Sequence, residues 1–258
     1  MLTRAKVSLQ ATDAPRRLSH FILAKVLFAM PGAVRKSIFA GEKYYCPICG
    51  TNLSRFLVLH RPYHRWCPVC RSLQRHRLLW TFLTRTSILD EQQPQRLLHF
   101  AAEACLAQKF ANMPHLDYVT ADLADPSAMV KMDITHIRFP DHSFDVILCS
   151  HVLEHVPDDH KALCELQRVL RPGGLVIIMV PIVGDATHED PNVTDPLERE
   201  RLFGQFDHVR VYGRDFEQRL KRAGFSARST STEEVVSHDE IERMGLARHE
   251  TFFVCRKG

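Results

Sequence analysis

The stretch Phe144-Asp-Val-Ile-Leu-Cys-Ser-His-Val-Leu-Glu-His-Val156 decides how the rest of this chain is interpreted. Its first half contains a short apolar run with β-branched residues, Val146 to Leu148, which predicts a buried strand. Its second half brings a serine, two histidines and a glutamate together within six residues, from Ser150 to His155. Ligands of open α/β sheets bind outside the carboxyl ends of the strands. The stretch therefore predicts a strand that ends in a functional site.

Strands and helices are expected to alternate around this stretch. We expect strands over residues 96–100, 116–122, 131–134, 144–150 and 175–180, with two late strands near 225–230 and 251–256. Helices are expected over residues 103–112, 158–170 and 214–223. Because helices link successive strands, the pattern predicts an α/β fold with a mostly parallel sheet and helices on both faces.

The composition is that of a soluble protein with a substantial core. The 258 residues suggest one or two domains, and 45% of them are hydrophobic and 25% charged. The net charge of +4 does not indicate a particular class of partner. Residues 18–30 resemble the core of a signal peptide, but His20 and Lys25 interrupt the run, which is too short to span a bilayer. We expect a cytoplasmic protein whose residues 15–30 form an amphipathic helix that packs on the protein or contacts a membrane surface.

Two Cys-x-x-Cys pairs, Cys46/Cys49 and Cys67/Cys70, are separated by 17 residues. This spacing is typical of a tetrahedral zinc site, because each short pair turns both sulfur atoms toward one ion. All four ligands would be thiolates, so we expect a structural zinc ribbon with no open coordination position. Two disulfides are the alternative, and the reducing compartment expected for this chain disfavours them.

The sequence suggests three parts: an N-terminal helical segment over 1–40, a zinc-ribbon module with a linking helix over 41–90, and an α/β domain over 91–258. Within the module we expect a strand at 55–60 and the linking helix at 72–89. The interval from Glu42 to Asp90 contains no other acidic residue, but it contains Arg55, Arg61, Arg65, Arg71, Arg75, Arg77 and Arg85. Such local positive charge favours a phosphate-rich partner such as RNA, and a solvated basic face is the alternative.

Two stretches carry a resemblance to a known family: residues 144–156, quoted above, and Glu165-Leu-Gln-Arg-Val-Leu-Arg-Pro-Gly-Gly174. With the order of elements over residues 96–257, they resemble the class I S-adenosylmethionine-dependent methyltransferases, and more specifically the methyltransferase type 11 group. The resemblance implies a Rossmann-like methyltransferase fold with a doubly wound, mostly parallel, seven-stranded sheet. It also implies that S-adenosyl-L-methionine lies across the carboxyl ends of the first, second and fourth strands.

The resemblance places cofactor-binding residues at these strand ends. Asp122 lies 22 residues after Phe100, which ends the first strand and is expected to contact the cofactor. A carboxylate at this offset can accept hydrogen bonds from both ribose hydroxyls. Asp133 matches the position that meets the adenine amine, with Ile134 beside the ring. The alternative for both aspartates is a turn or a helix cap.

The turn after the first strand departs from the family pattern. The family has a glycine-rich turn there, whereas this chain has Ala101-Ala-Glu-Ala-Cys105, which contains no glycine. Alanine takes a positive φ less readily than glycine, so we expect either a different loop shape or lost binding. If binding is retained, Ala101 contacts the cofactor and Glu103 faces its ammonium group. Cys149 and Ser150 match the strand end that lines its methionine part.

Methyl transfer to oxygen or nitrogen requires an aligned acceptor and a group that takes its proton. His151 and His155 follow the fourth strand, and either can be that base. His208 and Arg210 alternate in an extended stretch after the fifth strand, so both are expected to face an anionic acceptor. The alternatives are that His155 shapes the loop before the next helix, and that residues 185–212 form a polar lid with internal salt bridges.

Three functions are consistent with these features. The first is S-adenosylmethionine-dependent methyl transfer to a small-molecule or glycan-like, anionic acceptor, with a structural Zn²⁺ site. The second is an RNA methyltransferase whose basic zinc ribbon holds the substrate. The third is a non-catalytic zinc-ribbon binding protein with a degenerate cofactor site. Cofactor titration separates the third from the others, and salt-dependent RNA binding separates the second from the first.

Overall fold

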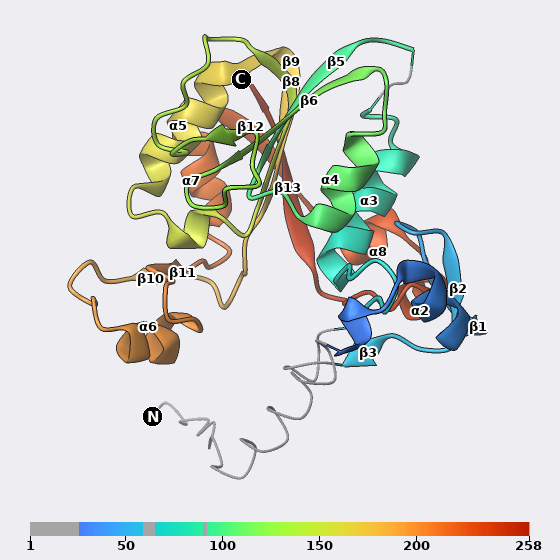
Figure 1. Ribbon diagram of the computed structural model, residues 1–258. Coiled ribbons are helices and arrows are strands. Elements are labelled where there is room, and N and C mark those ends of the chain that lie inside the picture. Colours follow the sequence, from blue (N-terminus) through green and yellow to red (C-terminus); the bar gives the residue numbers. More distant parts are fainter. Residues whose placement is uncertain (1–25, 59–64, 90–91, 258) are drawn as a thin grey trace. The chain divides into compact units, whose positions relative to one another are not determined.

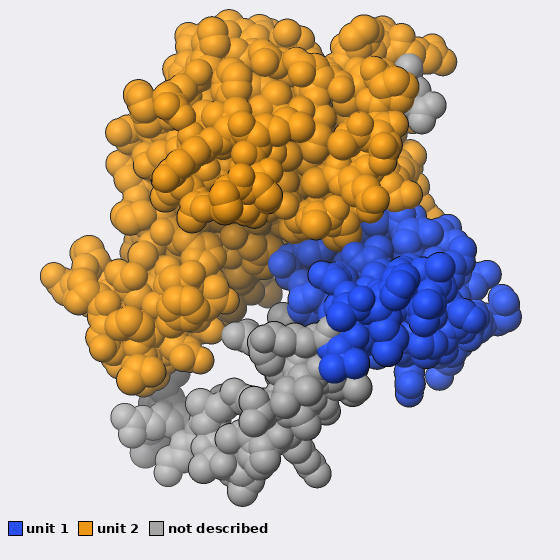
Figure 2. Space-filling view, viewed as in Figure 1, with its two compact units in different colours: residues 1–78, 238–247 blue, residues 79–237, 248–258 orange. Residues whose placement is uncertain are grey.

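The computed structural model describes residues 26–58, 65–89 and 92–257. The chain divides into unit 1, residues 1–78 and 238–247, and unit 2, residues 79–237 and 248–258 (Figure 2). The domain boundaries expected at 40/41 and 90/91 stay predictions, and the compact units divide the chain at 78/79 and include residues 238–247 in unit 1. Residues 15–25 of the expected N-terminal helix and 59–60 of the expected ribbon strand lie outside the described residues. Over the described ranges, no helix is both long and apolar enough to cross a membrane.

Unit 1 consists of short antiparallel strand pairs and short helices. β1 (Ala40–Cys46) pairs with β2 (Thr51–Leu53), and β3 (Leu57–Val58) pairs with β4 (Arg65–Trp66). α2 (Gly32–Ile38) precedes β1, and α9 (His238–Arg243) contacts β1 from near the end of the sequence. α3 (Gln74–Arg85) begins in unit 1 and ends in unit 2, and it is shorter at both ends than the helix expected over 72–89.

A buried arginine explains why the late segment belongs to unit 1. Arg77 is fully buried, and its guanidinium donates to the carbonyls of Met244, at 2.7 Å, and Gly245, at 2.9 Å. Both carbonyls directly follow the C-terminus of α9, where a positive charge is stabilising. The same guanidinium donates to the carbonyls of Ser72 and Arg65. The bonds to Met244 and Gly245 join residues 167 and 168 positions apart, and no local pattern in the sequence indicates them.

Unit 2 contains a seven-stranded sheet in the order β12-β13-β9-β8-β5-β6-β7. The strands are β5 (Gln95–Phe100), β6 (Leu116–Asp122), β7 (Val130–Lys131), β8 (Phe144–Ser150), β9 (Leu170–Met179), β12 (Phe225–Ser231) and β13 (Thr251–Lys257). Neighbours pair in parallel except at β13, which is antiparallel to both β9 and β12. α5 (Asp159–Val169) and α7 (Phe216–Arg222) cover one face, and α4 (Ala104–Phe110) covers the other (Figure 1). The expected doubly wound α/β fold, including both late strands, is confirmed.

The polar segment after β9 holds small elements that the strand–helix rhythm does not predict. β10 (His188–Glu189) pairs with β11 (Arg210–Val211), and α6 (Pro196–Phe203) lies between them in sequence. A short 3₁₀ helix, η2 (Leu153–His155), follows β8, and α8 (Thr232–Val235) follows β12. The segment between β9 and α7 therefore contains a two-stranded antiparallel pair, β10 and β11.

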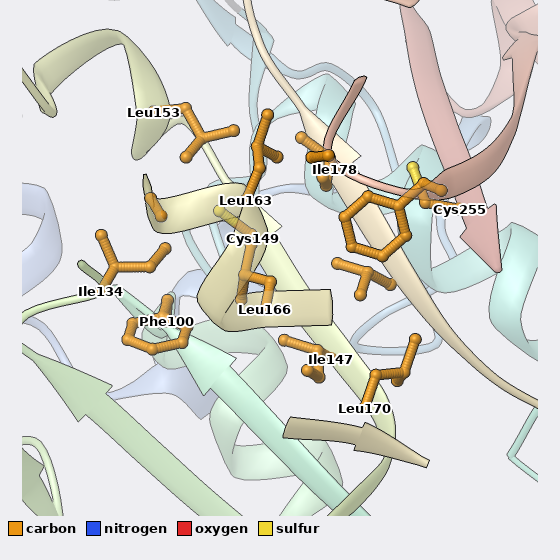
Figure 3. Close-up of a cluster of buried hydrophobic side chains, with 14 of the residues drawn as sticks. Phe100, Ile134, Ile147, Cys149, Leu153, Leu163, Leu166, Leu170, Ile178 and Cys255 are labelled. Carbon is orange, nitrogen blue, oxygen red and sulfur yellow. The ribbon is translucent and has the colours of Figure 1, made fainter. Parts of the chain in front are cut away.

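β8 is held rigidly between β5 and β9, and six of its seven residues are buried. Its Ile147 and Cys149 belong to one hydrophobic cluster with Leu163 and Leu166 of α5 (Figure 3). Burying a leucine or isoleucine side chain contributes about 1.5–3 kcal/mol. α5 is capped by Asp158, whose side chain accepts a hydrogen bond from the Lys161 amide at 2.9 Å. This packing fixes the position of the carboxyl end of β8.

The third strand is shorter than expected, because β7 covers only Val130–Lys131 rather than 131–134. Asp133 follows the strand, and its Oδ1 accepts hydrogen bonds from the amide and the hydroxyl of Thr135, both at 2.8 Å. Such a local side-chain bond offers the backbone a turn in place of a strand ladder. Asp133 is therefore presented on a turn beyond the sheet.

Candidate active site

A cavity of about 720 Å³ lies in unit 2 at the carboxyl ends of β5, β6 and β8. β5 and β8 are neighbours at the point where the strand order reverses, which is where doubly wound sheets bind their ligands. The volume suits a small-molecule or cofactor site. Seven of the predicted site residues line the cavity: Phe100, Ala101, Asp122, Asp133, Ile134, His151 and His155. Five others do not: Glu103, Cys149, Ser150, His208 and Arg210.

Asp122 and Asp133 each use one carboxylate oxygen for the local backbone. Asp122 Oδ1 accepts hydrogen bonds from the amides of Ala124, at 2.7 Å, and Asp125, at 2.8 Å, as Asp133 Oδ1 does from Thr135. The capping role weighed from the sequence is therefore real for both. In the described part of the chain, Oδ2 of each aspartate has no protein partner, so each retains an acceptor for a ligand.

The glycine-free turn takes a backbone conformation that alanine rarely adopts. Ala101 has a φ of 49°, in the left-handed region. Its amide donates to the Ala121 carbonyl at 2.9 Å, so the turn continues the pairing between β5 and β6. The left-handed region costs a non-glycine residue about 1–2 kcal/mol. The turn thus has the conformation that glycine favours, without the glycine.

Glu103 is the N-cap residue just before α4, and its side chain is mostly buried. Its Oε2 lies 3.0 Å from His99 Nε2, and His99 is fully buried in β5 with its other ring nitrogen 3.0 Å from the Tyr118 hydroxyl. This pairing anchors the turn to the sheet beneath it. The expected contact between Glu103 and an ammonium group stays a prediction.

Cys149 is a core residue, which corrects the prediction that it lines the methionine part of the cofactor. Its side chain is 1% exposed and packs with Ile147 and Leu163 in the hydrophobic cluster (Figure 3). Burial raises the pKa of its thiol, so the sulfur is a neutral apolar group. Side chains alternate between faces along a strand, and Cys149 shares the face of Ile147 rather than that of Ser150. Ser150 is 5% exposed, and its hydroxyl has no partner among the described residues.

His151 is held by a buried carboxylate. It follows β8 with a φ of 54°, and its Nδ1 lies 3.0 Å from Oε1 of Glu154, which is 1% exposed. His151 lines the cavity, and its Nε2 is buried without a partner in the described residues. A histidine whose Nδ1 faces a carboxylate is oriented as a general base through Nε2. This geometry favours His151 over His155 as the base.

His155 and His208 lie against each other beside the cavity. Their ring centroids are 4.7 Å apart at an interplanar angle of 83°. His155 Nδ1 lies 3.3 Å from Oδ2 of Asp207, and His208 Nδ1 lies 3.0 Å from the Phe203 carbonyl. Burial lowers the pKa of His208, so it is neutral near pH 7. With Glu154, the two histidines form a group whose ligand atoms lie within 4.8 Å of one another.

Arg210 has a structural role, which corrects the prediction that it faces the acceptor. It is 4% exposed, and its Nε donates to Glu189 Oε2 at 2.7 Å. Its two terminal nitrogens donate to the carbonyls of Leu153, Val156 and Pro157, in the loop after β8. Arg210 therefore clamps the loop that carries His151 and His155, and the expected internal salt bridges of the segment are present.

The sequence did not single out some of the residues that line the cavity. Leu123 and Thr135 line the cavity without having been predicted. Each lies within two residues of a predicted aspartate, so closeness in sequence to Asp122 and Asp133 could have identified them. Asp207 also lines the cavity, next to His155. Its position depends on how the segment after β9 folds back, and no pattern in the sequence reveals this.

The four cysteines of unit 1 form one compact group. Cys46 Sγ lies 3.6 Å from Cys70 Sγ, and Cys49 Sγ lies 3.7 Å from Cys67 Sγ. A tetrahedral zinc site with Zn–S bonds of about 2.3 Å has S···S edges of about 3.8 Å. All four are free cysteines, so the alternative of two disulfides is not what the structure shows. Hydrogen bonds from the neighbouring thiols of Cys49, Cys67 and Cys70 lower the pKa of Cys46 and favour its thiolate.

The basic stretch of unit 1 uses several of its arginines internally. Arg77 is buried against backbone carbonyls, and Arg71 donates to the Phe28 carbonyl at 2.7 Å with its guanidinium 4.7 Å from the ring centre of the same residue. Arg55 lies over the Phe39 ring at 5.6 Å. The charge expected to attract RNA is therefore partly committed to the structure of unit 1.

Part of unit 2 is similar in sequence to known methyltransferases. Residues 100–178 match the family model of a methyltransferase domain. The arsenite methyltransferase of Aquipseudomonas alcaligenes is 28% identical over 120 residues, which are 45% of this chain and 33% of that protein. A ubiquinone/menaquinone biosynthesis C-methyltransferase of Hahella chejuensis is 40% identical over 55 residues, which are 21% of this chain and 22% of that protein. The chain thus matches a third or less of the length of these curated relatives.

Solved structures of methyltransferases are also similar. The 1,6-didemethyltoxoflavin-N1-methyltransferase of Burkholderia thailandensis, solved with S-adenosylhomocysteine, has a TM-score of 0.48 and 15% identity, over 70% of this chain and 76% of that chain. Residues 100–178 are therefore similar to a methyltransferase domain.

Proposed function

We propose that the cavity of unit 2 binds S-adenosyl-L-methionine and that the chain transfers the methyl group to an oxygen or nitrogen of a small-molecule or glycan-like acceptor. The observation that carries this proposal is the pair of aspartates at the cavity, each with one carboxylate oxygen that has no partner among the described residues. Their placement after β6 and β7 suits the two ends of a nucleoside.

The residues present fit the cofactor. Asp122 would accept hydrogen bonds from the ribose hydroxyls, and Asp133 would accept one from the adenine amine. Phe100, Ile134 and Leu123 give the same cavity apolar surface against which a purine can pack. The positive φ of Ala101 keeps the turn in the glycine-like shape, which speaks against a degenerate, non-catalytic site.

The acceptor side relies on this chain's own groups. The cofactor, when bound, supplies a methyl group on a positively charged sulfur. His151 Nε2, unpartnered at the cavity, would take the proton from the acceptor's oxygen or nitrogen, and Glu154 would stabilise the resulting imidazolium through Nδ1. Arg210 is committed to the loop, and none of the described residues that line the cavity is an arginine that could meet an anionic acceptor.

In this proposal the four-cysteine group of unit 1 binds Zn²⁺ and stabilises the ribbon. The support is the match of the sulfur separations to a tetrahedral site and the absence of an open ligand position. The RNA alternative loses support, because Arg77 is buried and Arg71 is bonded to unit 1 itself.

Isothermal titration with S-adenosylhomocysteine tests the cofactor site directly. We expect binding by the wild type and at least about tenfold weaker binding by Asp122→Asn, which is about 1.4 kcal/mol. Asp239→Asn, an exposed carboxylate of α9, is the matched control and should bind as the wild type does. A wild-type protein that gives no heat, or an Asp122→Asn variant with unchanged affinity, would contradict the proposal.

A further inference from the structure

We propose that Glu154, His155 and His208 form a second metal site, at the wall of the cavity, for a divalent transition-metal ion such as Zn²⁺ or Fe²⁺. One ligand atom from each residue lies within 4.8 Å of the other two. Two imidazoles and one carboxylate form the donor set of metal sites that keep open coordination positions. Carboxylate and imidazole donors also distinguish this group chemically from the four thiolates of unit 1.

The carboxylate of Glu154 is the strongest indication of a bound ligand. Glu154 is 1% exposed, and among the described residues one of its oxygens has a partner: Oε1, which lies 3.0 Å from His151 Nδ1. Its Oε2 is buried and without a hydrogen-bond partner in the described residues. Leaving a buried acceptor unsatisfied costs about 1–3 kcal/mol, and more for a charged group. A cation beside Oε2 would remove that cost.

In both histidines, one ring nitrogen contacts a hydrogen-bond acceptor, as is usual for histidines that bind a metal through the other nitrogen. His208 Nδ1 lies 3.0 Å from the Phe203 carbonyl, so this nitrogen carries the proton and Nε2 keeps its lone pair. His155 Nδ1 lies 3.3 Å from Oδ2 of Asp207, a carboxylate that fixes the ring in the same manner. Ligating histidines almost always donate their other ring N–H to a carbonyl or a carboxylate. The partners of a metal site are therefore in place around both rings.

The fold holds the two ligand-bearing segments together independently of an ion. Glu154 and His155 lie in η2, and His208 lies just after α6, more than fifty positions later. The Val209 amide donates to the Glu154 carbonyl at 2.9 Å, which fixes His208 next to η2. Arg210 donates to the carbonyls on either side of the two ligands, and its charge is paired with Glu189. The two segments are thus held together by bonds that involve neither the Glu154 carboxylate nor the two imidazole rings.

The position of the site suggests what its open coordination positions bind. His155 lines the cavity, so an ion on its ring would face the acceptor side. A divalent ion there would supply the positive charge that Arg210 does not, and it would take an oxygen of an anionic acceptor. This last step rests on the proposed methyl transfer, whereas metal binding itself does not.

Metal content of the full chain tests the site without any activity assay. The protein is stripped with a chelator, reloaded with Zn²⁺, desalted, and analysed for bound zinc by atomic absorption. We expect His208→Ala and Glu154→Gln each to hold one ion fewer per chain than the wild type. His160→Ala, an exposed histidine on α5 outside the group, is the control and should hold as many ions as the wild type. Equal zinc content in all four proteins would overturn the proposal.

A spectroscopic measurement on the wild type keeps the test independent of how the variants fold. Co²⁺ held by thiolates absorbs strongly in the near ultraviolet, whereas Co²⁺ held by imidazole and carboxylate shows only weak visible bands. We expect titration with Co²⁺ to give both signatures, and the weak bands alone to persist after the thiols are alkylated. Absence of the weak bands would overturn the proposal. Unchanged affinity of Glu154→Gln for S-adenosylhomocysteine separates loss of the metal from failure of the cofactor site.

Discussion

In unit 1 the four-cysteine group and Arg77 place their polar atoms against protein partners, whereas two polar atoms beside the cavity of unit 2 have none in the described residues. The four sulfur atoms of the cysteine group face one another, and Arg77 places its guanidinium on four carbonyls. In unit 2, Oε2 of Glu154 and Nε2 of His151 are buried and unpartnered in the described residues. Buried polar groups are nearly always satisfied, so the two exceptions beside the cavity are candidates for contact with a ligand.

The difference separates a structural centre from a reactive one. A closed set of thiolates stabilises the fold because every ligand position belongs to the protein. Around the cavity, the protein holds polar side chains in place and leaves one polar atom of each for a ligand. The two regions should therefore respond differently to substitution: unit 1 through stability, and the cavity through binding and turnover.

The largest expected effect is the loss of one cysteine of the zinc site proposed for unit 1. Cys67→Ser should abolish zinc binding by the four-cysteine group and lower the free energy of unfolding of unit 1 by more than about 5 kcal/mol, because structural zinc contributes folding energy directly. Urea unfolding and zinc analysis measure this. Cys164→Ser, at an exposed cysteine of α5, should leave both unchanged. A Cys67→Ser protein with wild-type zinc content and stability would remove the structural role given to this group.

Next in size is the loss of the buried guanidinium. Arg77→Met should lower the free energy of unfolding by about 3 kcal/mol, because it leaves buried carbonyls at the end of α9 without donors. Arg71→Met removes a guanidinium that donates to one carbonyl in an exposed setting, so its effect should stay below about 1 kcal/mol. Urea denaturation of the two variants compares them. Equal effects would mean that burial of Arg77 is not what ties residues 238–247 to unit 1.

A smaller effect, on turnover alone, is expected in the cavity. His151→Asn should lower kcat about a hundredfold, or about 2.7 kcal/mol, by removing the base, while affinity for S-adenosylhomocysteine stays within about twofold. The acceptor for this assay comes from a screen of small hydroxy and amino compounds with methyl-labelled cofactor. His160→Asn should behave as the wild type. An unchanged kcat for His151→Asn would mean that another residue is the base. Weaker binding of S-adenosylhomocysteine by this variant would mean that His151 contacts the cofactor rather than the acceptor.

The sequence predicted the order of strands and helices well, because apolar periodicity depends on neighbours within a few residues. It also located Asp122, Asp133 and His151 at the cavity, since the carboxyl ends of parallel strands meet at one edge. Cys149 was assigned to the wrong role because a resemblance at a strand end does not say which face a side chain occupies. Arg210 was misassigned because its partners lie more than fifty positions away, in the loop after β8.

The smallest expected effect comes from glycine substitutions in the turn after β5. Ala101 has a φ of 49°, which costs alanine about 1–2 kcal/mol, and glycine removes this cost but loses about 0.5–1 kcal/mol to backbone entropy. Ala101→Gly should therefore raise the free energy of unfolding by about 0.5 kcal/mol. Ala102 is not among the positive-φ residues of the described chain, so Ala102→Gly should lower it by a similar amount. Opposite signs in paired urea titrations would show that the turn holds backbone strain at the cofactor side, as functional sites often do. If both variants lose stability, Ala101 is not strained, and the turn differs from the glycine-rich form in shape as well as in sequence.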